Sequence, residues 1–259
     1  MRFTGERLIP GIPRLENMIV EELARLHFVR PYFAGKTVLD AGCGVGYGTH
    51  FLAESSARWA LGIDISGEAI DYATENYQRD NLAFCVMDCT RLGLEDESFD
   101  MVCSLDLIEH LVQVDQYLTE ICRVLKPDGS YYMSTPNRKV SSTASGRASW
   151  AFHEREFSLD ELRELLEVYF QEITIWGVYV PAYEDHPIRK LTKSPLSQIK
   201  HILPPRLRVW VSSSIRFWIK PDLHLDDVVF STAGLEKTPA FVALCGRKRT
   251  LDEMKPIRR

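Results

Sequence analysis

The chain has 259 residues, of which 45% are hydrophobic and 26% charged, so it is long enough for one large α/β domain and is neither disordered nor collagen-like. No apolar run reaches the ~18–20 residues that a membrane-spanning helix needs, and the opening MRFTGERLIPG lacks the apolar core of a secretory signal peptide. The net charge of −5 argues against a general nucleic-acid binder. We therefore expect a cytoplasmic protein that does not bind nucleic acid.

The cysteines are not spaced as a metal or disulfide framework. None forms a CxxC pair, and several fall in stretches that have the pattern of strands or helices. We predict reduced, mostly buried thiols at positions 43, 85, 89, 103, 122 and 245.

Short apolar strands alternate with helical patterns from residue 37 to residue 135. The expected strands are 37–40, 59–64, 82–87, 99–104 and 130–134. The expected helices cover 46–55, the segment after the cap at Ser66, and the segment that ends at Leu125, followed by a KPDG turn at 126–129. This alternation predicts βαβ units, and hence a parallel sheet flanked by helices.

The second half adds a capped helix and two more strands. Ser158 and Glu161 have the spacing of a capping box, and strands are expected at 172–180 and 240–245. The segment 181–239 is too long for a structureless connection, so it is expected to be an insertion or cap. The chain then divides into 1–36, an N-terminal cap helix region; 37–180, the core; 181–239, the insertion; and 240–259, the last strand and tail.

The strongest motif is VLDAGCGVGYG at 38–48, where an expected strand runs through a glycine-rich loop into a helix. Glycines allow close approach of a ligand, and free N–H groups at a helix start attract anionic groups. Asp64 follows at the end of the next strand, where an acid can accept both hydroxyls of a ribose. The dinucleotide pattern G-x-G-x-x-G fails, because its third glycine position holds Tyr47 or Thr49. Asp40, just before the loop, suits a cationic group such as an ammonium.

Five ordered segments resemble the motifs of class I S-adenosylmethionine-dependent methyltransferases. They are VLDAGCGVGYGTHFLA, GIDIS, the strand-end Asp88, SFDMVCSLDLIEHL and RVLKPDGSYYMSTPN, within 37–178. The resemblance implies a Rossmann-like, seven-stranded, mostly parallel sheet of order 3-2-1-4-5-7-6, with an antiparallel last strand, and S-adenosyl-L-methionine as cofactor. TGERLIPG and HEREFSLDEL are also similar to a subgroup associated with glycan and sugar-modifying enzymes.

The resemblance also implies the cofactor contacts. The loop residues would hold the methionine part, Asp40 its ammonium, Asp64 the ribose, and Asp88 the adenine amino group. Arg25 would meet the cofactor carboxylate, or else be a surface charge of a helix. The whole expected set is Arg25, Asp40, Ala41, Gly42, Cys43, Gly44, Tyr47, Asp64, Ile65, Asp88, Cys89, Ser104 and Leu105.

A hydroxyl acceptor needs a base to take its proton, and histidine is the usual candidate. His110 follows the fourth expected strand in LIEHL, next to Glu109, and His153 lies in FHEREF beyond the fifth. These three are the candidate catalytic residues, although His110 could equally serve only as a support of the site. We expect no metal, because only Asp106, Glu109 and His110 could be forced into a ligand set.

The insertion contains a basic block. Residues 187–220 include eight lysines and arginines and no acidic residue, and RLRVWVSSSIRFWI within it has an amphipathic helical pattern. Three interpretations remain open. The helix could pack on the main sheet or on a second copy of the chain in a homodimer. It could bind a membrane surface, which would suit a lipid-linked acceptor and place the protein at the inner face of the membrane. It could also bind a phosphate-bearing acceptor.

The sequence thus predicts a methyltransferase that acts on a small molecule, with a sugar or glycan hydroxyl as the favoured acceptor. A quinone-like or phenolic metabolite is the alternative acceptor. A non-catalytic module that binds S-adenosylmethionine is the competing class of function.

Overall fold

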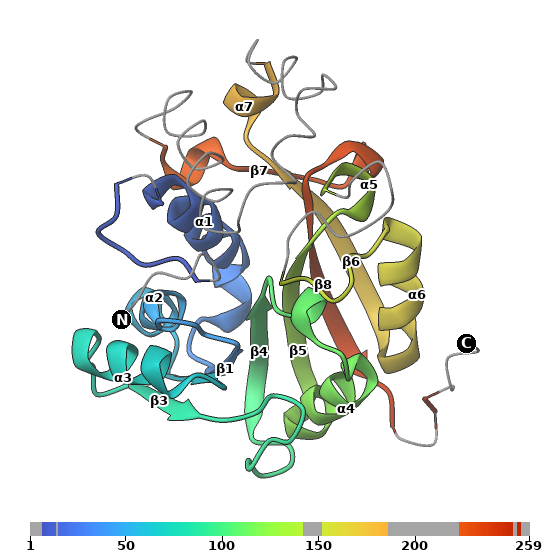
Figure 1. The fold of residues 1–259 in the computed structure, drawn as a ribbon. Helices are drawn as coiled ribbons and strands as arrows, with labels where there is room; N and C mark the ends of the chain where they lie inside the picture. Colours follow the sequence, from blue (N-terminus) through green and yellow to red (C-terminus); the bar gives the residue numbers. More distant parts are fainter. Residues whose placement is uncertain (1–6, 14, 142–151, 186–222, 251–252, 255–259) are drawn as a thin grey trace.

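The computed structural model describes residues 7–13, 15–141, 152–185, 223–250 and 253–254. Its centre is an eight-stranded sheet of order β3-β2-β1-β4-β5-β8-β6-β7 (Figure 1). The strands are β1 (Thr37–Ala41), β2 (Trp59–Asp64), β3 (Leu82–Val86), β4 (Phe99–Leu105), β5 (Leu125–Pro136), β6 (Phe170–Tyr179), β7 (Val229–Ser231) and β8 (Ala240–Lys248).

The expected strand order is confirmed. Strands β1 to β5 pair in parallel, and β8 runs antiparallel between β5 and β6. The short strand β7, which the sequence did not predict, adds to the free edge of β6. The sheet therefore has the order that the resemblance implied, with one extra edge strand.

Helices connect the strands. They are α1 (Glu16–Phe33), α2 (Tyr47–Ser55), α3 (Gly67–Asn76), η1 (Ile108–His110), α4 (Val114–Val124), α5 (Arg138–Ser141), α6 (Leu159–Tyr169), α7 (Pro181–Asp185), η3 (Leu225–Asp227) and η4 (Leu235–Lys237). Both predicted caps are present: Ser66 accepts a hydrogen bond from the Ala69 amide, and Ser158 with Glu161 forms the reciprocal capping box.

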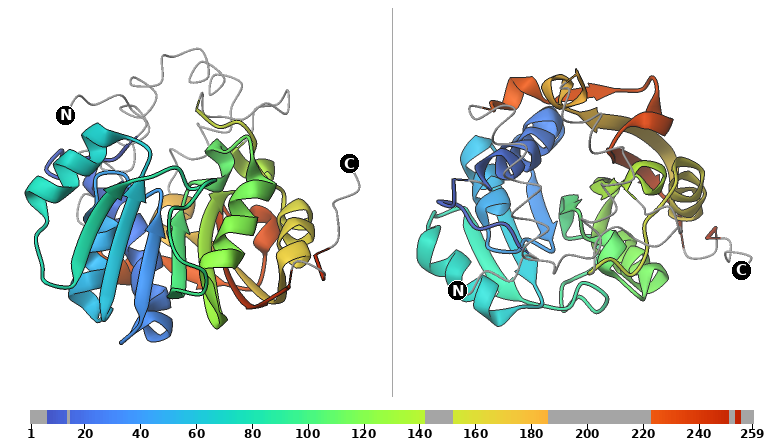
Figure 2. Two further views of the ribbon diagram at one scale, coloured as in Figure 1. Left: turned by 90° about the horizontal axis from the view of Figure 1, so that it is seen from below. Right: turned by 45° about the horizontal axis from the view of Figure 1, so that its top comes forward.

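Two apolar cores lie on opposite faces of the sheet, because neighbouring side chains of a strand point to opposite sides. Val38 packs in one cluster with Leu26 of α1 and Leu52 of α2. Leu39 packs in the other with Ile121 of α4 and Leu166 of α6. Helices therefore cover both faces (Figure 2), and the carboxyl ends of the parallel strands remain as the edge where a ligand can bind.

One expected boundary is wrong. The KPDG segment at 126–129 does not separate α4 from the fifth strand, because β5 already begins at Leu125. Leu125 pairs with Phe99, whereas the next pair joins Met101 to Ser130, so the register shifts between the two pairs. The additional residues of β5 form an irregularity of the bulge type.

Most of the insertion, including the basic block 187–220, lies outside the described residues. The described flanks pack on the main domain: Val180, Leu223 and Val228 share a core cluster with α1. Within the described part of the chain, no helix combines the length and apolarity needed to cross a membrane.

The cysteines agree with the prediction. All six are free, four of them are buried, and Cys85 and Cys89 are more accessible. Burial raises the pKa of Cys89 to about 12, so this thiol is a poor nucleophile near neutral pH.

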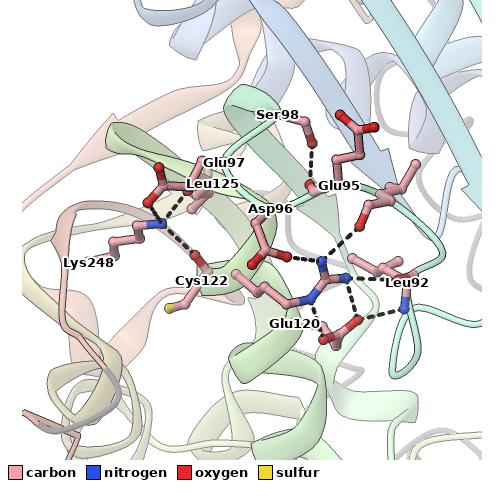
Figure 3. Close-up of polar contacts among 11 residues, drawn as sticks. Leu92, Glu95, Asp96, Glu97, Ser98, Glu120, Cys122, Leu125 and Lys248 are labelled. Carbon is pink, nitrogen blue, oxygen red and sulfur yellow. Dashed lines mark hydrogen bonds and ion pairs between the residues drawn. The ribbon is translucent and has the colours of Figure 1, made fainter.

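At the opposite end of the sheet from the strand carboxyl termini, α4 is tied to the loop between β3 and β4. The Arg123 guanidinium donates to the Leu92 and Leu94 carbonyls and to the Asp96 and Glu120 carboxylates at 2.6–2.9 Å. Figure 3 shows this network and, beside it, Lys248 of β8, whose ammonium donates to the carbonyls of Cys122 and Leu125.

Arg123→Ala is expected to lower the unfolding free energy by about 2 kcal/mol, because it leaves two part-buried carbonyls and the Glu120 carboxylate without their donor. For a chain of this size, that loss corresponds to a melting temperature ~4–8 °C lower. Differential scanning calorimetry measures it. Arg91→Ala, which removes an exposed arginine of the same loop, is the control and should melt like the wild type; equal melting of both variants would contradict the assignment.

Candidate active site

The glycine loop between β1 and α2 has a backbone that requires glycine. Gly42, Gly44 and Gly46 have φ angles of +78°, +55° and +87°. A Cβ at Gly46 would lie 2.6 Å from the Ala73 Cβ and 2.7 Å from the Phe84 ring, so no larger residue fits there. The loop thereby presents its backbone at the carboxyl end of β1.

Asp64, at the end of β2, fixes this loop. Its Oδ2 accepts a hydrogen bond from the Gly44 amide at 3.0 Å, and its Oδ1 accepts from the Ser66 amide at 2.8 Å. Arg7 adds an ion pair to Oδ1 at 3.1 Å. The carboxylate is therefore held beside the glycine loop, as expected of the ribose ligand.

Arg7 belongs to a segment that we call the N-terminal arm, residues 7–13. Its side chain approaches the loop as well as Asp64, since a Cβ on Gly44 would lie 4.0 Å from the Arg7 Cδ. The sequence analysis did not identify Arg7. The TGER motif that contains it was the available indication.

A small cavity beside the loop carries two carboxyl groups. It is lined by Glu22, Leu26, Asp40, Gly42, Cys43, Tyr47, Gly48 and Leu105. Glu22, from α1, accepts a hydrogen bond from the Tyr47 hydroxyl, and Asp40 accepts one from the Thr49 hydroxyl. Burial raises the pKa of Glu22 to about 7 and that of Asp40 to about 6. Two acids that are this costly to ionise suit a cationic ligand, which would restore their charge.

Binding of S-adenosylmethionine is therefore expected to strengthen as pH rises from about 5.5 to about 7.5, roughly tenfold. The sign follows from the raised pKa values: at low pH both acids are protonated, and the ligand's ammonium must displace a proton to bind. Titration calorimetry at the two pH values, in buffers of different ionisation enthalpy, measures both the affinity and the released protons. Glu22→Gln should flatten the upper part of the plot of affinity against pH. A dissociation constant of the wild type that does not change with pH would contradict the prediction.

Two apolar side chains flank Asp64 on the side expected for the adenine. Ile65 is 70% exposed and Val86, at the end of β3, is 52% exposed. Asp88 is exposed and its Oδ1 accepts hydrogen bonds from the amide and hydroxyl of Thr90, which is the geometry of a local turn. The surface for a flat aromatic ring is thus present, while the contact of Asp88 with the adenine amino group stays a prediction.

The remaining expected cofactor residues divide by position. Cys43 and Leu105 line the cavity, whereas Ala41 and Ser104 are fully buried within their strands. Cys89 is half-buried and packs against the core. Ala41 and Ser104 therefore shape the sheet beneath the site and do not line it.

Arg25 is not a surface charge, because it is only 8% exposed. Its Nη1 donates to the Asp106 Oδ2 at 2.5 Å and to the Ser134 hydroxyl at 3.1 Å. Burial opposes ionisation of Asp106, but Arg25 and the Ser134 hydroxyl hold its pKa below the usual range. Asp106 also has a φ of +48°, in the left-handed region that aspartate adopts more readily than most non-glycine residues. Arg25 thus fixes the turn between β4 and η1.

Two of the predicted catalytic residues, Glu109 and His110, follow that turn in η1, and the structure brings His153 beside them. The rings of His110 and His153 lie 4.9 Å apart between centroids, nearly perpendicular to each other. Nδ1 of His110 lies 2.9 Å from the Phe152 carbonyl, and the Glu109 carbonyl accepts the amides of Glu154 and Arg155. These contacts hold the 152–156 segment against η1.

Glu109 is fully buried. Its Oε2 accepts from the Thr135 hydroxyl at 3.0 Å, and its Oε1 has no hydrogen-bond partner among the described residues. Burial raises the pKa of Glu109 well above its usual range. One ligand atom from each of Glu109, His110 and His153 lies within 4.8 Å of the others. This grouping differs from the one considered from the sequence, because Asp106 is paired with Arg25 and His153 takes its place.

Sequence reasoning missed Glu156. This residue is 3% exposed, and its Oε1 lies 2.8 Å from Nδ1 of His153. Its Oε2 accepts from the Ser141 hydroxyl at 2.7 Å. The spacing of His153 and Glu156 in HEREF was the available indication.

A family model described as "Methyltransferase domain" matches residues 33–174, more than half of the chain. The chain belongs to this methyltransferase family. The matched range contains the glycine loop, Asp64 and the His110 turn, so family membership rests on the segment that builds the site.

Individual relatives agree. A probable S-adenosylmethionine-dependent methyltransferase of Mycolicibacterium smegmatis is 36% identical over 170 residues, covering 63% of this chain and 63% of the relative, so the chain spans just under two thirds of its length. A mitochondrial ubiquinone biosynthesis O-methyltransferase of Dictyostelium discoideum is 33% identical over 123 residues, 43% of this chain and 38% of the relative. A putative Haloferax volcanii methyltransferase, solved with its Trm112 activator, shares the fold at a TM-score of 0.59 and 18% identity, over 92% and 95% of the two chains.

Relatives of the chain are named as S-adenosylmethionine-dependent methyltransferases, so S-adenosyl-L-methionine is the cofactor. We predict that Asp40 and Glu22 meet its ammonium end, Asp64 its ribose, and Ile65 and Val86 its adenine. The positions of these residues around the glycine loop agree with this prediction. The glycine loop, between the two ends of the site, allows a ligand to approach the backbone closely.

Proposed function

We propose that the chain transfers the methyl group of S-adenosylmethionine to a hydroxyl group of a small molecule, with a sugar or glycan as the favoured acceptor. One observation carries the proposal: the cavity with its two carboxyl groups and the pair of histidines lie at the same edge of the sheet. Leu105, at the end of β4, lines the cavity, and the turn with His110 follows directly. A donor and an acceptor can therefore meet at this edge.

When bound, S-adenosylmethionine supplies an electrophilic methyl group on its sulfonium. The residues of the chain position the two reactants and accept the proton. The Asp64 carboxylate and the glycine loop fix the donor, and holding both reactants in line can contribute ~7–11 kcal/mol. A histidine at the edge takes the hydroxyl proton, a contribution of typically ~10²–10⁴-fold.

Two other functions remain as candidates. A quinone-like or phenolic acceptor is supported by the name of the Dictyostelium relative, a ubiquinone biosynthesis O-methyltransferase. A non-catalytic binding module is the competing class. The contact of His153 with the Glu156 carboxylate, next to His110, favours catalysis over a binding module.

The basic block adds a proposal about location. Attraction to anionic lipid is worth ~1 kcal/mol per basic residue near the surface. The eight basic residues of 187–220 would therefore suit an acceptor carried on a lipid at the inner face of the membrane. A cap helix or a homodimer contact remains the alternative role of this segment.

The test is direct. The full chain is incubated with methyl-labelled S-adenosylmethionine and, separately, with methyl rhamnoside, methyl glucoside and catechol, and mass spectrometry detects the methylated product. Labelled product with a glycoside supports the sugar acceptor, and labelled catechol alone moves the assignment to the phenolic class. Tight cofactor binding without transfer to any of the three, or to a metabolite extract, would favour the binding module.

A further inference from the structure

We propose that Glu156 is the positioning carboxylate of the catalytic base, and that His153, rather than His110, is that base. The inference rests on the proposed function, since it assigns the proton acceptor for methyl transfer to a hydroxyl group. It extends the site to a residue that the sequence analysis did not single out.

The first step of the argument concerns the ring nitrogens. A carboxylate only accepts hydrogen bonds, so the contact of 2.8 Å between Glu156 Oε1 and His153 Nδ1 requires the proton on Nδ1. The basic lone pair then lies on Nε2. In water, neutral histidine prefers the opposite tautomer. Glu156 therefore selects the form in which the other nitrogen can take a proton.

The second step compares the two histidines. His110 Nδ1 contacts the neutral carbonyl of Phe152, whereas His153 contacts a carboxyl group whose side chain is fully buried. When a proton arrives, the imidazole becomes a cation. A buried carboxylate stabilises this cation much more than a carbonyl does, because charge–charge interactions are strong away from water. His153 is thus the better proton acceptor of the pair.

The third step is rigidity. The Ser141 hydroxyl donates to Glu156 Oε2 at 2.7 Å, so both oxygens of the carboxylate are held. The amides of Glu154 and Arg155 donate to the Glu109 carbonyl and fix the same segment on η1. The His153 side chain is itself only 10% exposed. A base fixed in this way loses little freedom during the reaction.

The proposed step balances. The acceptor oxygen bonds to the methyl carbon as the carbon–sulfur bond breaks, and the sulfur keeps the electron pair as a neutral thioether. The hydroxyl proton moves to His153 Nε2. The resulting imidazolium is paired with Glu156, and it later loses the proton to water.

Glu156→Gln keeps the shape of the side chain and removes its charge, and Glu154→Gln, at an exposed glutamate of the same segment, is the matched control. With the acceptor probe that gives product, we expect Glu156→Gln to lower kcat about 100-fold, with the KM for S-adenosylmethionine unchanged. His153→Ala should lower kcat by as much. The double variant that combines Glu156→Gln with His153→Ala should lower it no further than either single variant. His110→Ala should retain more activity than His153→Ala.

A second readout does not depend on turnover. In nitrogen-15 NMR spectra of histidine-labelled protein, His153 should be in the Nδ1-protonated tautomer, and Glu156→Ala should shift it towards the Nε2-protonated one. Equal activity of Glu156→Gln and Glu154→Gln, or additive losses in the double variant, would overturn the inference while methyl transfer stands. Loss of activity on chelation, restored by Zn²⁺ or Mg²⁺, would also overturn it, because Glu109, His110 and His153 would then hold an ion. An inactive wild type would instead remove the proposed function.

Discussion

Asp64→Ala is expected to weaken S-adenosylmethionine binding about 100-fold, because a carboxylate bonded to a ribose hydroxyl is worth ~1.5–3 kcal/mol. The variant also removes the acceptor of the hydrogen bonds that the Gly44 and Ser66 amides and the Arg7 guanidinium donate to Asp64. The loop would lose the support that keeps it open to the cofactor. Titration calorimetry with S-adenosylmethionine and its demethylated product measures the change.

Asp71→Ala is the matched control for charge, since Asp71 is an exposed carboxylate on α3, the helix that follows Asp64. It should bind like the wild type. A thermal melt of both variants separates loss of affinity from loss of fold. If Asp64→Ala binds as tightly as Asp71→Ala, the ribose site lies elsewhere.

Arg25→Met is expected to have the largest effect on stability. Removing one partner of a buried ion pair costs about 3–5 kcal/mol, and solvent at the half-exposed Asp106 reduces this to about 2–3 kcal/mol. The Arg25 side chain is 10% exposed and that of Asp106 is 37% exposed. Denaturant unfolding at neutral pH measures the difference. Arg30→Met, at an exposed position of the same helix, should unfold like the wild type.

The pH dependence of this loss has a defined sign. Arg25 lowers the pKa of Asp106 in the folded protein. Its contribution is complete above the ordinary carboxyl range and is lost as pH falls through the lowered pKa. The gap between wild type and Arg25→Met should therefore narrow in acid, below about pH 4. A gap that is constant with pH would show that the loss comes from packing alone.

The donor half of the site could be predicted from the sequence because local rules determine it. A glycine loop after a buried strand has one geometry, and an acid at the end of the next parallel strand must lie beside it. Asp40, Asp64 and the loop therefore lie where the motifs placed them. The strand order followed from the same motifs, apart from β7, which three residues of no marked pattern form at the sheet edge.

Other residues of the site depend on long-range contacts, which spacing does not encode. Glu22 reaches the cavity only because α1 packs on α2, and Glu156 reaches His153 only because the 152–156 segment docks on η1. Arg25 is a similar case. A charged residue on a terminal helix is normally exposed, but Arg25 is buried because Asp106, in the turn after β4, pairs with it. The KPDG segment differs in another way: it lies between the pairs Phe99–Leu125 and Met101–Ser130, so its residues form the irregularity within β5 and do not precede the strand.

The ion pair between Arg7 and Asp64 joins the N-terminal arm to the end of β2, beside the expected cofactor site. The carboxylate expected to hold the sugar of the cofactor is shared with an arginine from the start of the chain, so every exchange of spent donor for fresh donor passes this contact. Arg7 itself is not expected to take part in bond making. In an enzyme whose turnover is limited by product release, this contact would therefore influence the rate without altering the chemical step.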